Sequence, residues 1–307
     1  MKLKHIVDTK QFLDRKLIAD IFKRAERFEK SERQGRTSKI LKNKILASVF
    51  YEPSTRTRFS FESAMLKLGG ETISTESAGQ FSSSIKGEAL EDSIKVISGY
   101  ADVIVLRHPD ADSAERAANV SSVPVINAGS GDGEHPTQAL LDLYTIKKEL
   151  VRIDNLKIAL VGDLLYGRTI HSLLQLLSLG KNVEIFLISP NTLALPKIYL
   201  SFLKSHTMKF SEHNSLKNIL KDIDVLYMTR VQKERFSSPK LYEKVKHVFT
   251  LDKKALNTLD KEAIIMHPLP RVNEIHSSVD SDRRAAYFQQ AKNGLYIRMA
   301  LLELLLT

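Results

Sequence analysis

The fold is set by a stretch that begins as an apolar run and ends in hydroxyls and guanidiniums. It reads Ile45-Leu46-Ala47-Ser48-Val49-Phe50, then Tyr51-Glu52-Pro53, then Ser54-Thr55-Arg56-Thr57-Arg58. The apolar run is typical of a buried strand, and the apolar residues after Arg58 recur at roughly helical spacing. The polar pentapeptide therefore falls where a strand passes into the first turn of a helix.

This position suits an anion. The first N–H groups of a helix have no intrahelical partner, and the helix dipole adds partial positive charge there. Arg56 and Arg58 can add charge-assisted hydrogen bonds to phosphate oxygens, and the three hydroxyls can donate as well. The alternative is an ordinary Ser or Thr cap followed by surface arginines. Two arginines and three hydroxyls within five residues favour an anion site.

Strand and helix patterns alternate along the rest of the chain. Further strands are expected at 71–75, 101–106, 123–127, 157–161, 183–188, 224–228 and 263–266. Helical patterns fill most of the gaps, starting with an amphipathic helix over 12–33. Such alternation predicts parallel sheets that are covered on both faces.

Two further helices are expected to organise these strands into domains. Residues 135–150, with Pro136 near the start, predict a helix that joins two halves of the chain. The apolar stretch 285–306 predicts a closing helix that packs back on the first half. The sequence therefore predicts an α/β fold of two doubly wound parallel-sheet domains joined by an interdomain helix, with the active site in the cleft.

Composition narrows the class of protein. The chain has 307 residues, of which 43% are hydrophobic, enough for two ordinary domains. No apolar run reaches the roughly 20 residues of a membrane helix, and the start lacks the pattern of a signal peptide. Together with the absence of cysteine, this predicts a cytoplasmic protein without a membrane partner. The net charge of +10 is dispersed, so we expect small anionic substrates and no nucleic acid.

Polar clusters follow several predicted strands, where open α/β sheets bind ligands. These clusters are Arg107-His108-Pro109, His135-Pro136-Thr137-Gln138 behind the glycine-rich 127–133, Gly162–Arg168, Thr229-Arg230-Val231-Gln232 and His267-Pro268-Leu269-Pro270-Arg271. Taken singly, each arginine could be a surface residue with a carboxylate neighbour, and the last cluster could be only a rigid turn. Their recurrence, with no run of carboxylates to pair them, favours a site for anions. The histidines lack metal-ligand spacing, so no metal is predicted.

Three of these motifs together resemble the carbamoyltransferases, over about residues 44–305: 54–58, 135–138 and 267–270. The octapeptides 162–169 and 228–235 resemble the aspartate branch. The ornithine branch carries a cysteine where this chain has Pro268. The resemblance implies transfer of the carbamoyl group of carbamoyl phosphate to the amine of L-aspartate. The products would be N-carbamoyl-L-aspartate and phosphate, in de novo pyrimidine synthesis, formed without a cofactor by a homotrimer with shared sites. A regulatory chain in a larger complex is left open.

The resemblance also assigns domains and roles. Residues 1–134, with the helix 285–307, would bind carbamoyl phosphate, 135–150 would link, and 151–284 would bind aspartate. The carbamoyl phosphate group comprises Ser54, Thr55, Arg56, Thr57, Arg107, His135, Gln138, Leu269 and Pro270. Within it Arg56, Thr57, Arg107 and His135 would be catalytic. Arg168, Arg230, Gln232 and Lys86 would bind aspartate, with Ser82 and Lys86 lent by a neighbouring subunit. A cis bond is predicted between Leu269 and Pro270.

Three other interpretations stay open at this point. Ornithine could be the acceptor, although Arg168 and Arg230 would repel its cationic side chain. The chain could be an inactive anion-binding module that keeps the fold. It could also bind nucleic acid through its positive charge, which predicts binding with a steep salt dependence.

Overall fold

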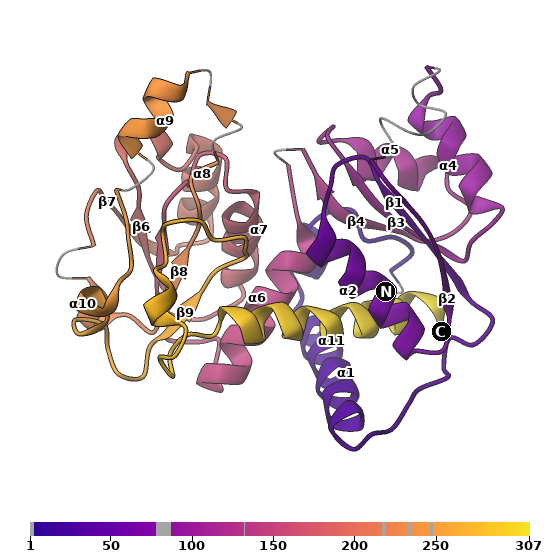
Figure 1. Cartoon of the computed structure of the whole chain (residues 1–307), viewed down its shortest axis with the longest axis horizontal. Coiled ribbons are helices and arrows are strands. Elements are labelled where there is room, and N and C mark those ends of the chain that lie inside the picture. Colours follow the sequence, from indigo (N-terminus) through magenta and orange to yellow (C-terminus); the bar gives the residue numbers. More distant parts are fainter. Residues whose placement is uncertain are drawn as a thin grey trace. The chain divides into compact units, whose positions relative to one another are not determined.

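The computed structural model describes residues 3–77, 87–131, 133–216, 219–232, 235–236, 238–245 and 248–307. Ser82 and Lys86 lie outside these ranges. The chain divides into two compact units, Met1–Leu141 with Lys292–Thr307 (unit 1) and Asp142–Ala291 (unit 2). Each unit contains one sheet whose strand pairs are all parallel, as the alternating pattern predicts (Figure 1).

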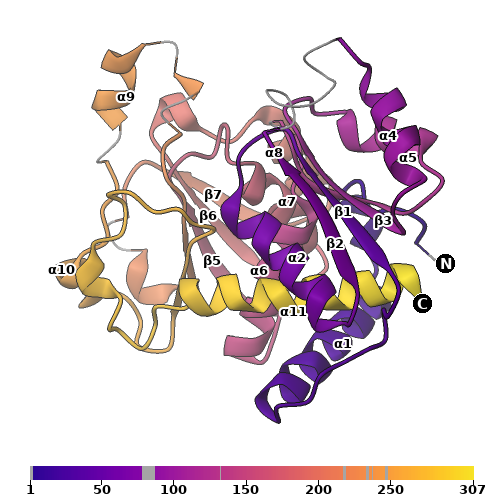
Figure 2. The same ribbon diagram turned by 45° about the vertical axis from the view of Figure 1, so that its right-hand side comes forward.

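Unit 1 is built on a four-stranded sheet of order β2-β1-β3-β4. The strands are β1 (Ile45–Phe50), β2 (Glu71–Glu76), β3 (Val103–His108) and β4 (Val125–Ser130). Helices α4 (Leu90–Ser98) and α5 (Ser113–Val120) cover one face, and α2 (Thr55–Lys67) lies on the other (Figure 2). Ala47 and Val49 of β1 pack with Leu90 and Ile94 of α4 in one core cluster. The short η1 (Lys10–Phe12) precedes α1 (Arg15–Arg33), whose Arg24 contacts the buried Glu303 at 3.0 Å.

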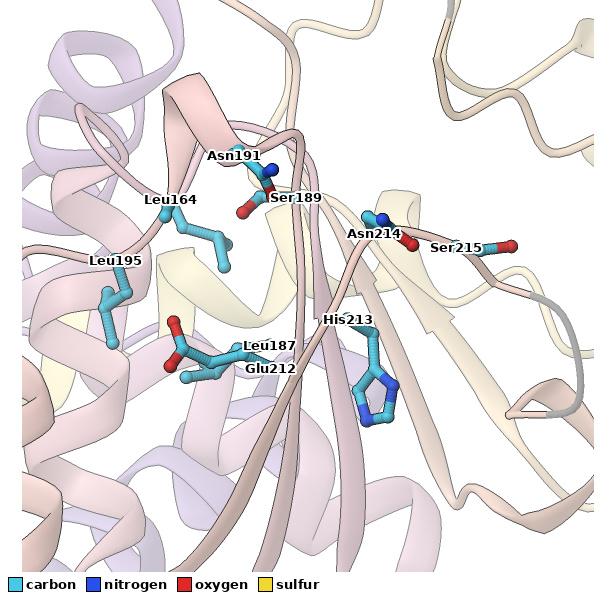
Figure 3. A pocket seen from close by; sticks show the side chains of 10 residues that line it. Leu164, Leu187, Ser189, Asn191, Leu195, Glu212, His213, Asn214 and Ser215 are labelled. Atoms are coloured by element: carbon cyan, nitrogen blue, oxygen red, sulfur yellow. The ribbon is translucent and has the colours of Figure 1, made fainter.

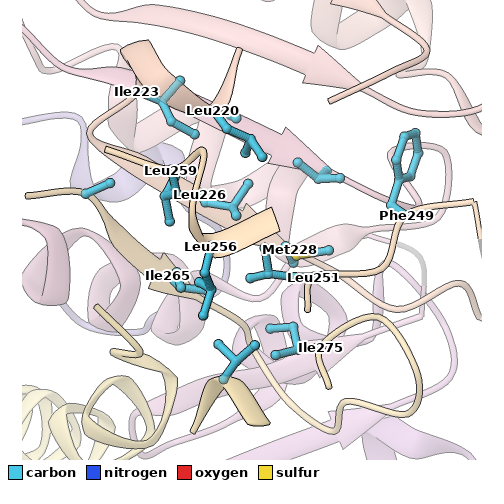
Figure 4. Packing of buried hydrophobic residues seen from close by; sticks show 14 of the residues in the cluster. Leu220, Ile223, Leu226, Met228, Phe249, Leu251, Leu256, Leu259, Ile265 and Ile275 are labelled. Carbon is cyan, nitrogen blue, oxygen red and sulfur yellow. The ribbon is translucent and has the colours of Figure 1, made fainter. Parts of the chain in front are cut away.

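Unit 2 is built on a five-stranded sheet of order β7-β6-β5-β8-β9. Its strands are β5 (Lys157–Val161), β6 (Glu184–Ile188), β7 (Lys209–His213), β8 (Val225–Met228) and β9 (Ile264–Met266). Its helices are α7 (Arg168–Leu177), η3 (Asn191–Leu193), α8 (Lys197–Ser205), η4 (Leu220–Asp222), α9 (Pro239–Val245), α10 (Lys253–Leu256) and η6 (Ser277–Val279). Leu226, Met228 and Ile265 pack with Leu256 and Leu259 on one face of the sheet (Figure 4).

Two helices contain the boundaries between the units. Helix α6 (Pro136–Leu150) includes the boundary after Leu141, and α11 (Tyr287–Leu306) includes the one after Ala291. Unit 1 is therefore made of two segments of chain that are separated in sequence by all of unit 2. None of the described helices is both long enough and apolar enough to cross a membrane.

The strand order places one switch point in each sheet. In unit 1 the chain leaves β1 towards β2 on one side and returns to β3 on the other. In unit 2 the equivalent neighbours are β5 and β8. Loops that leave such a pair of strands diverge and open a crevice at the carboxyl ends, which is where ligands bind in open α/β sheets. The motifs 54–58, 162–169 and 228–235 follow β1, β5 and β8 of these pairs, whereas 135–138 and 267–270 follow β4 and β9.

Candidate active site

The loop after β1 forms the first part of the site in unit 1. Ser54 is the N-cap of α2, yet its side chain makes no capping hydrogen bond. The Ser54 hydroxyl instead accepts from Nη1 of Arg107 at 3.4 Å. Thr57, in the first turn, is buried. The start of α2 thus keeps its N–H groups uncapped by that side chain and gathers hydroxyls beside them, which suits a phosphate.

Arg107 is held beside this loop by the sheet. It lies on β3 opposite Phe50 of β1, and its carbonyl accepts from the Tyr51 N–H at 2.8 Å. Burial lowers the pKa of Arg107, the carboxylate of Glu52 opposes that shift, and the charge of Arg56 lowers the pKa further. Two guanidiniums therefore lie close enough to repel each other. A bound dianion would relieve that repulsion.

Arg58 does not join this group, contrary to the expectation that both arginines of the motif could hold an anion. Its guanidinium lies 2.9 Å from Glu76 at the end of β2 and 3.6 Å from Glu62 one helical turn along. Glu76 also accepts from the Ser54 N–H at 3.3 Å. Arg58 therefore fastens α2 to the edge strand, and its charge is already balanced.

His135 and Gln138 stand at the start of α6, after β4. Both are buried, and the His135 carbonyl accepts from the Gln138 N–H at 3.0 Å. The loop after β4 is fixed to the neighbouring strand, because Gly131 N–H donates to the His108 carbonyl at 3.0 Å. The carboxyl ends of β1, β3 and β4 therefore all carry residues predicted for carbamoyl phosphate.

In unit 2 two of the predicted aspartate residues, Arg230 and Gln232, interact with a buried carboxylate, that of Asp163. Asp163 accepts from the Tyr166 N–H at 2.9 Å and from the Gln232 N–H at 3.3 Å. The Gln232 side chain donates to the Tyr166 carbonyl at 2.8 Å. Burial raises the pKa of Asp163, while the hydrogen bonds and the charge of Arg230 oppose the shift. Asp163 thereby ties the loop that precedes Arg168 to the loop after β8.

The backbone explains why a glycine precedes Asp163. Gly162 has φ of +118°, and a Cβ there would lie 2.3 Å from the Thr229 carbonyl oxygen. Only glycine fits both the conformation and the close approach of the two loops. The pair of loops can therefore present Arg168, Arg230 and Gln232 from neighbouring strand ends.

The turn after β9 is held by a histidine and a glutamate. The Leu269–Pro270 bond is cis, which confirms the prediction. The Nδ1 of His267 accepts from the Leu269 N–H at 2.8 Å, and its Nε2 lies 2.7 Å from Glu274 Oε1. Glu274 also accepts from the Asn273 N–H at 3.0 Å. Because its ring nitrogen accepts from Leu269, the neutral His267 donates to Glu274.

The structure therefore gathers the predicted residues in two groups. Ser54, Thr55, Arg56, Thr57, Arg107, His135 and Gln138 are in unit 1; Arg168, Arg230, Gln232, Leu269 and Pro270 are in unit 2. Sequence reasoning missed three carboxylates: Glu52, Asp163 and Glu274. The expectation that the cations lack carboxylate partners was therefore wrong for Arg107, which lies beside Glu52, and for His267, which lies beside Glu274. Asp163 stood inside a recognised motif, but nothing in the pattern showed that it organises two loops.

A separate hollow lies beside these loops in unit 2 (Figure 3). Its volume is about 340 Å3, and Leu164, Ser189, Leu195, Glu212 and His213 are among its lining residues. It contains none of the residues predicted for either substrate. Leu164 follows Asp163 directly, so the wall of the hollow and the predicted aspartate loop share a backbone segment.

Two parallel-sheet units with cationic side chains at their switch points are the features of a group-transfer enzyme that acts on anionic substrates. Comparison of the chain with known proteins identifies the family. The family described as "Aspartate/ornithine carbamoyltransferase, carbamoyl-P binding domain" matches residues 4–148, and its "Asp/Orn binding domain" matches residues 154–305. The chain therefore belongs to the aspartate/ornithine carbamoyltransferase family. Within this family it belongs with the aspartate carbamoyltransferases, as its relatives show.

These relatives match almost the whole chain. The aspartate carbamoyltransferase catalytic subunit of Methanocaldococcus jannaschii is 52% identical, covering 99% of this chain and 98% of the relative. The chloroplastic enzyme of Arabidopsis thaliana is 50% identical over 99% of this chain and 78% of its own length. A crystal form of the M. jannaschii subunit has a TM-score of 0.92, at 52% identity and coverage of 99% and 98%. The Trypanosoma cruzi enzyme with carbamoyl phosphate and aspartate has a TM-score of 0.94, at 38% identity and coverage of 100% and 98%.

Proposed function

We propose that the chain transfers the carbamoyl group of carbamoyl phosphate to the amine of L-aspartate, giving N-carbamoyl-L-aspartate and phosphate in pyrimidine synthesis. The observation that carries this proposal is that each sheet has a group of cationic side chains at its switch point, and that each group suits one of the two substrates. Arg56 and Arg107 converge at the start of α2, and Asp163 organises the loops of Arg168, Arg230 and Gln232. The first group suits a phosphate dianion and the second suits a dicarboxylic amino acid.

The donor is assigned to the residues that the resemblance to the carbamoyltransferases implies. Ser54, Thr55, Arg56 and Thr57 bind the phosphate oxygens, and Arg107 reaches both phosphate and carbonyl. Gln138 and the backbone at Leu269 and Pro270 hold the carbamoyl NH2 group. This assignment accounts for the fixed backbone of the turn, where His267 accepts from the Leu269 N–H and main-chain carbonyls would accept from an amide donor.

The reaction follows from where charge develops. The aspartate amine attacks the carbonyl carbon, a tetrahedral intermediate forms, and its C–O bond to phosphate breaks. Thr57, Arg107 and His135 stabilise the negative carbonyl oxygen, and Arg56 stabilises the departing phosphate. Donors fixed in advance at these positions stabilise the transition state more than the ground state. The leaving phosphate accepts the amine proton in this scheme.

The acceptor is selected by charge. Arg168 and Arg230 provide two guanidiniums for the two carboxylates of aspartate, and the Gln232 side chain is fixed beside Tyr166. Ornithine would place an ammonium group against a guanidinium and would be disfavoured. The T. cruzi enzyme, solved with both carbamoyl phosphate and aspartate, supports this choice by its similarity.

We further propose a homotrimer, in which Ser82 and Lys86 complete the site of a neighbouring subunit. Unit 1 carries exposed apolar side chains on α2 and β2, with Phe59 53%, Leu66 58% and Ile73 44% exposed. Phe59 and Leu66 are seven positions apart and share a helical face, and β2 is the edge strand of its sheet. Such a face is typical of one that another subunit covers.

The wider assembly and location belong to the same proposal. The M. jannaschii relative is named a catalytic subunit, which supports a complex with a regulatory chain. A cytoplasmic location is proposed from the lack of cysteine, although the Arabidopsis relative is named chloroplastic. Sedimentation of the purified chain would test the trimer.

The direct test is an acceptor assay. Purified chain is given carbamoyl phosphate with either L-aspartate or L-ornithine, without added metal, and the carbamoylated products are separated and quantified. Carbamoyl aspartate should form, with little or no citrulline. Turnover of ornithine alone would overturn the choice of acceptor, and turnover of neither would leave an anion-binding module.

A further inference from the structure

A series of buried hydrogen bonds in unit 2 ends at the carboxylate of Asp142, which has no role in the proposed reaction. The Tyr227 hydroxyl of β8 donates to Asp142 Oδ2 at 2.7 Å, and Nε2 of Gln290, on α11, donates to Asp142 Oδ1 at 2.7 Å. Asp142 and Tyr227 are 0% exposed and Gln290 is 1% exposed. A buried carboxylate with this satisfied set of donors fixes its partners firmly, because breaking either bond leaves an unpaired polar group.

One arm of this series ends at the carbamoyl turn. The His267 N–H donates to Gln290 Oε1 at 2.9 Å. The ring of the same histidine accepts from the Leu269 N–H at 2.8 Å. Asp142 thus orients Gln290, Gln290 holds the backbone of His267, and His267 holds the backbone of Leu269.

The other arm ends at the aspartate loop. Burial and Asp142 raise the pKa of Tyr227 well above its ordinary value, and a side-chain hydrogen bond with Thr169 opposes this shift. The single proton of the Tyr227 hydroxyl goes to Asp142, so Thr169 is the donor in the second bond. Thr169 follows Arg168 at the start of α7, so this arm fixes the helix turn that presents Arg168.

We infer that Asp142 is a positioning residue that sets both the carbamoyl turn at Leu269 and the start of α7 at Arg168. The inference rests on the proposed function, because those two places are assigned to substrates there. Every donor along both arms points towards Asp142. One carboxylate is the common acceptor for the structures that hold the two halves of the reaction.

The two arms differ in one way that makes the idea testable. On the Tyr227 arm both groups are hydroxyls, which can donate or accept and so can reverse. On the Gln290 arm the final group is the main-chain N–H of His267, which only donates. Gln290 must therefore face His267 with oxygen and Asp142 with nitrogen.

The test is a double-mutant cycle. Gln290→Glu keeps the acceptor for His267 but faces Asp142 with a second carboxylate, so the pair must share a proton. We expect the KM for carbamoyl phosphate to rise about tenfold at pH 8, or about 1.4 kcal/mol, and less at pH 6. Asp142→Asn alone should raise this KM only about threefold. The NH2 group of its side chain can donate to the Tyr227 hydroxyl, which can accept in place of donating. In Asp142→Asn/Gln290→Glu the amide NH2 group introduced at position 142 donates to the carboxylate introduced at position 290, and KM should return to within about threefold of wild type.

Two single-arm variants separate positioning from general stability. Gln290→Met should weaken binding of carbamoyl phosphate but not of inorganic phosphate, which lacks the carbamoyl group that the turn holds. Tyr227→Phe should raise the KM for aspartate more than that for carbamoyl phosphate. If Gln290→Glu does not fold, these two variants carry the test.

Additive losses in the double variant would overturn the inference, as would single-arm variants that lower the melting temperature and leave both KM values at wild type. These outcomes differ from a failure of the proposed function. If the proposed function is wrong, the wild-type chain itself makes no carbamoyl aspartate, whatever the variants do.

Discussion

Replacement of Asp163 by asparagine should weaken the binding of aspartate while changing the thermal stability of the chain little. Asp163 is fully buried and accepts from the N–H groups of Tyr166 and Gln232. Asparagine keeps one acceptor oxygen, so its NH2 group must face one of these N–H donors. The Tyr166 bond is the shorter, at 2.9 Å against 3.3 Å, so the Gln232 N–H should lose its acceptor. The charge that attracts Arg230 is also lost.

The size of the effect follows from that single lost partner. A buried donor left unsatisfied costs about 1–3 kcal/mol. Gln232 and Arg230 would shift away from positions suited to aspartate, so the KM for aspartate should rise about 5–150-fold. Carbamoyl phosphate, held mainly by residues of unit 1, should keep its affinity.

Stability should respond differently. Burial raises the pKa of Asp163 above 3.8, so the folded chain holds this proton more tightly than the unfolded chain does. The contribution to stability is therefore full at pH below 3.8 and is lost as pH rises through the raised value. A neutral asparagine avoids that loss, which offsets the cost of the unsatisfied Gln232 N–H, so the melting temperature at pH 7 should fall little or rise.

The assay is steady-state kinetics with each substrate varied, beside thermal unfolding. Asp252→Asn is the matched control, because this exposed cap of α10 accepts from the Ala255 N–H at 2.9 Å and asparagine caps equally well. An unchanged KM for aspartate in Asp163→Asn, or an equal rise for both substrates, would refute the reasoning.

Three further predictions concern unit 1 and the assembly. Arg56→Ala should lower turnover about 100–1,000-fold with unchanged thermal unfolding, because it removes a fixed donor to the phosphate; near-normal rates would exclude that role. Inactive Arg56→Ala and Lys86→Ala chains, mixed under conditions of subunit exchange, should recover part of the activity, and no recovery despite exchange would contradict shared sites. Glu32→Gln should lower stability by about 1 kcal/mol at pH 7, or about 2–4 °C by calorimetry. Lys67 and Tyr296 lower the pKa of Glu32 from 4.5 to about 2, so the deficit should vanish as pH falls from 4.5 towards 2; a constant deficit would count against this ion-pair cluster.

The sequence predicts the sheets well because most strands carry their own signal. The apolar run that opens the site became β1 with the predicted bounds, Ile45–Phe50, and 157–161 became β5 likewise. Strand β7, Lys209–His213, was not predicted, because Phe210 is its single large apolar residue. It is an edge strand that pairs with β6 alone. Its extended conformation therefore depends on hydrogen bonds to β6 and not on burial of its own side chains.

The site shows a similar limit. Motifs located the arginines, but the direction of each depends on a carboxylate from another element. Arg58 pairs with Glu76 of β2, and Glu62 four positions along the helix was a usable sign that Arg58 already had a partner. No comparable local spacing links Asp163 to Gln232, which are brought together only by the neighbouring strands β5 and β8.

The two-segment make-up of unit 1 has a consequence for synthesis on the ribosome. Its last segment, Lys292–Thr307, is translated only after the roughly 150 residues of unit 2. At about 5–20 residues per second, the earlier segment waits on the order of ten to thirty seconds for the helix that contributes Glu303 to Arg24 of α1. Unit 2 emerges without interruption, so the half of the nascent enzyme that is begun first should be the half that is finished last.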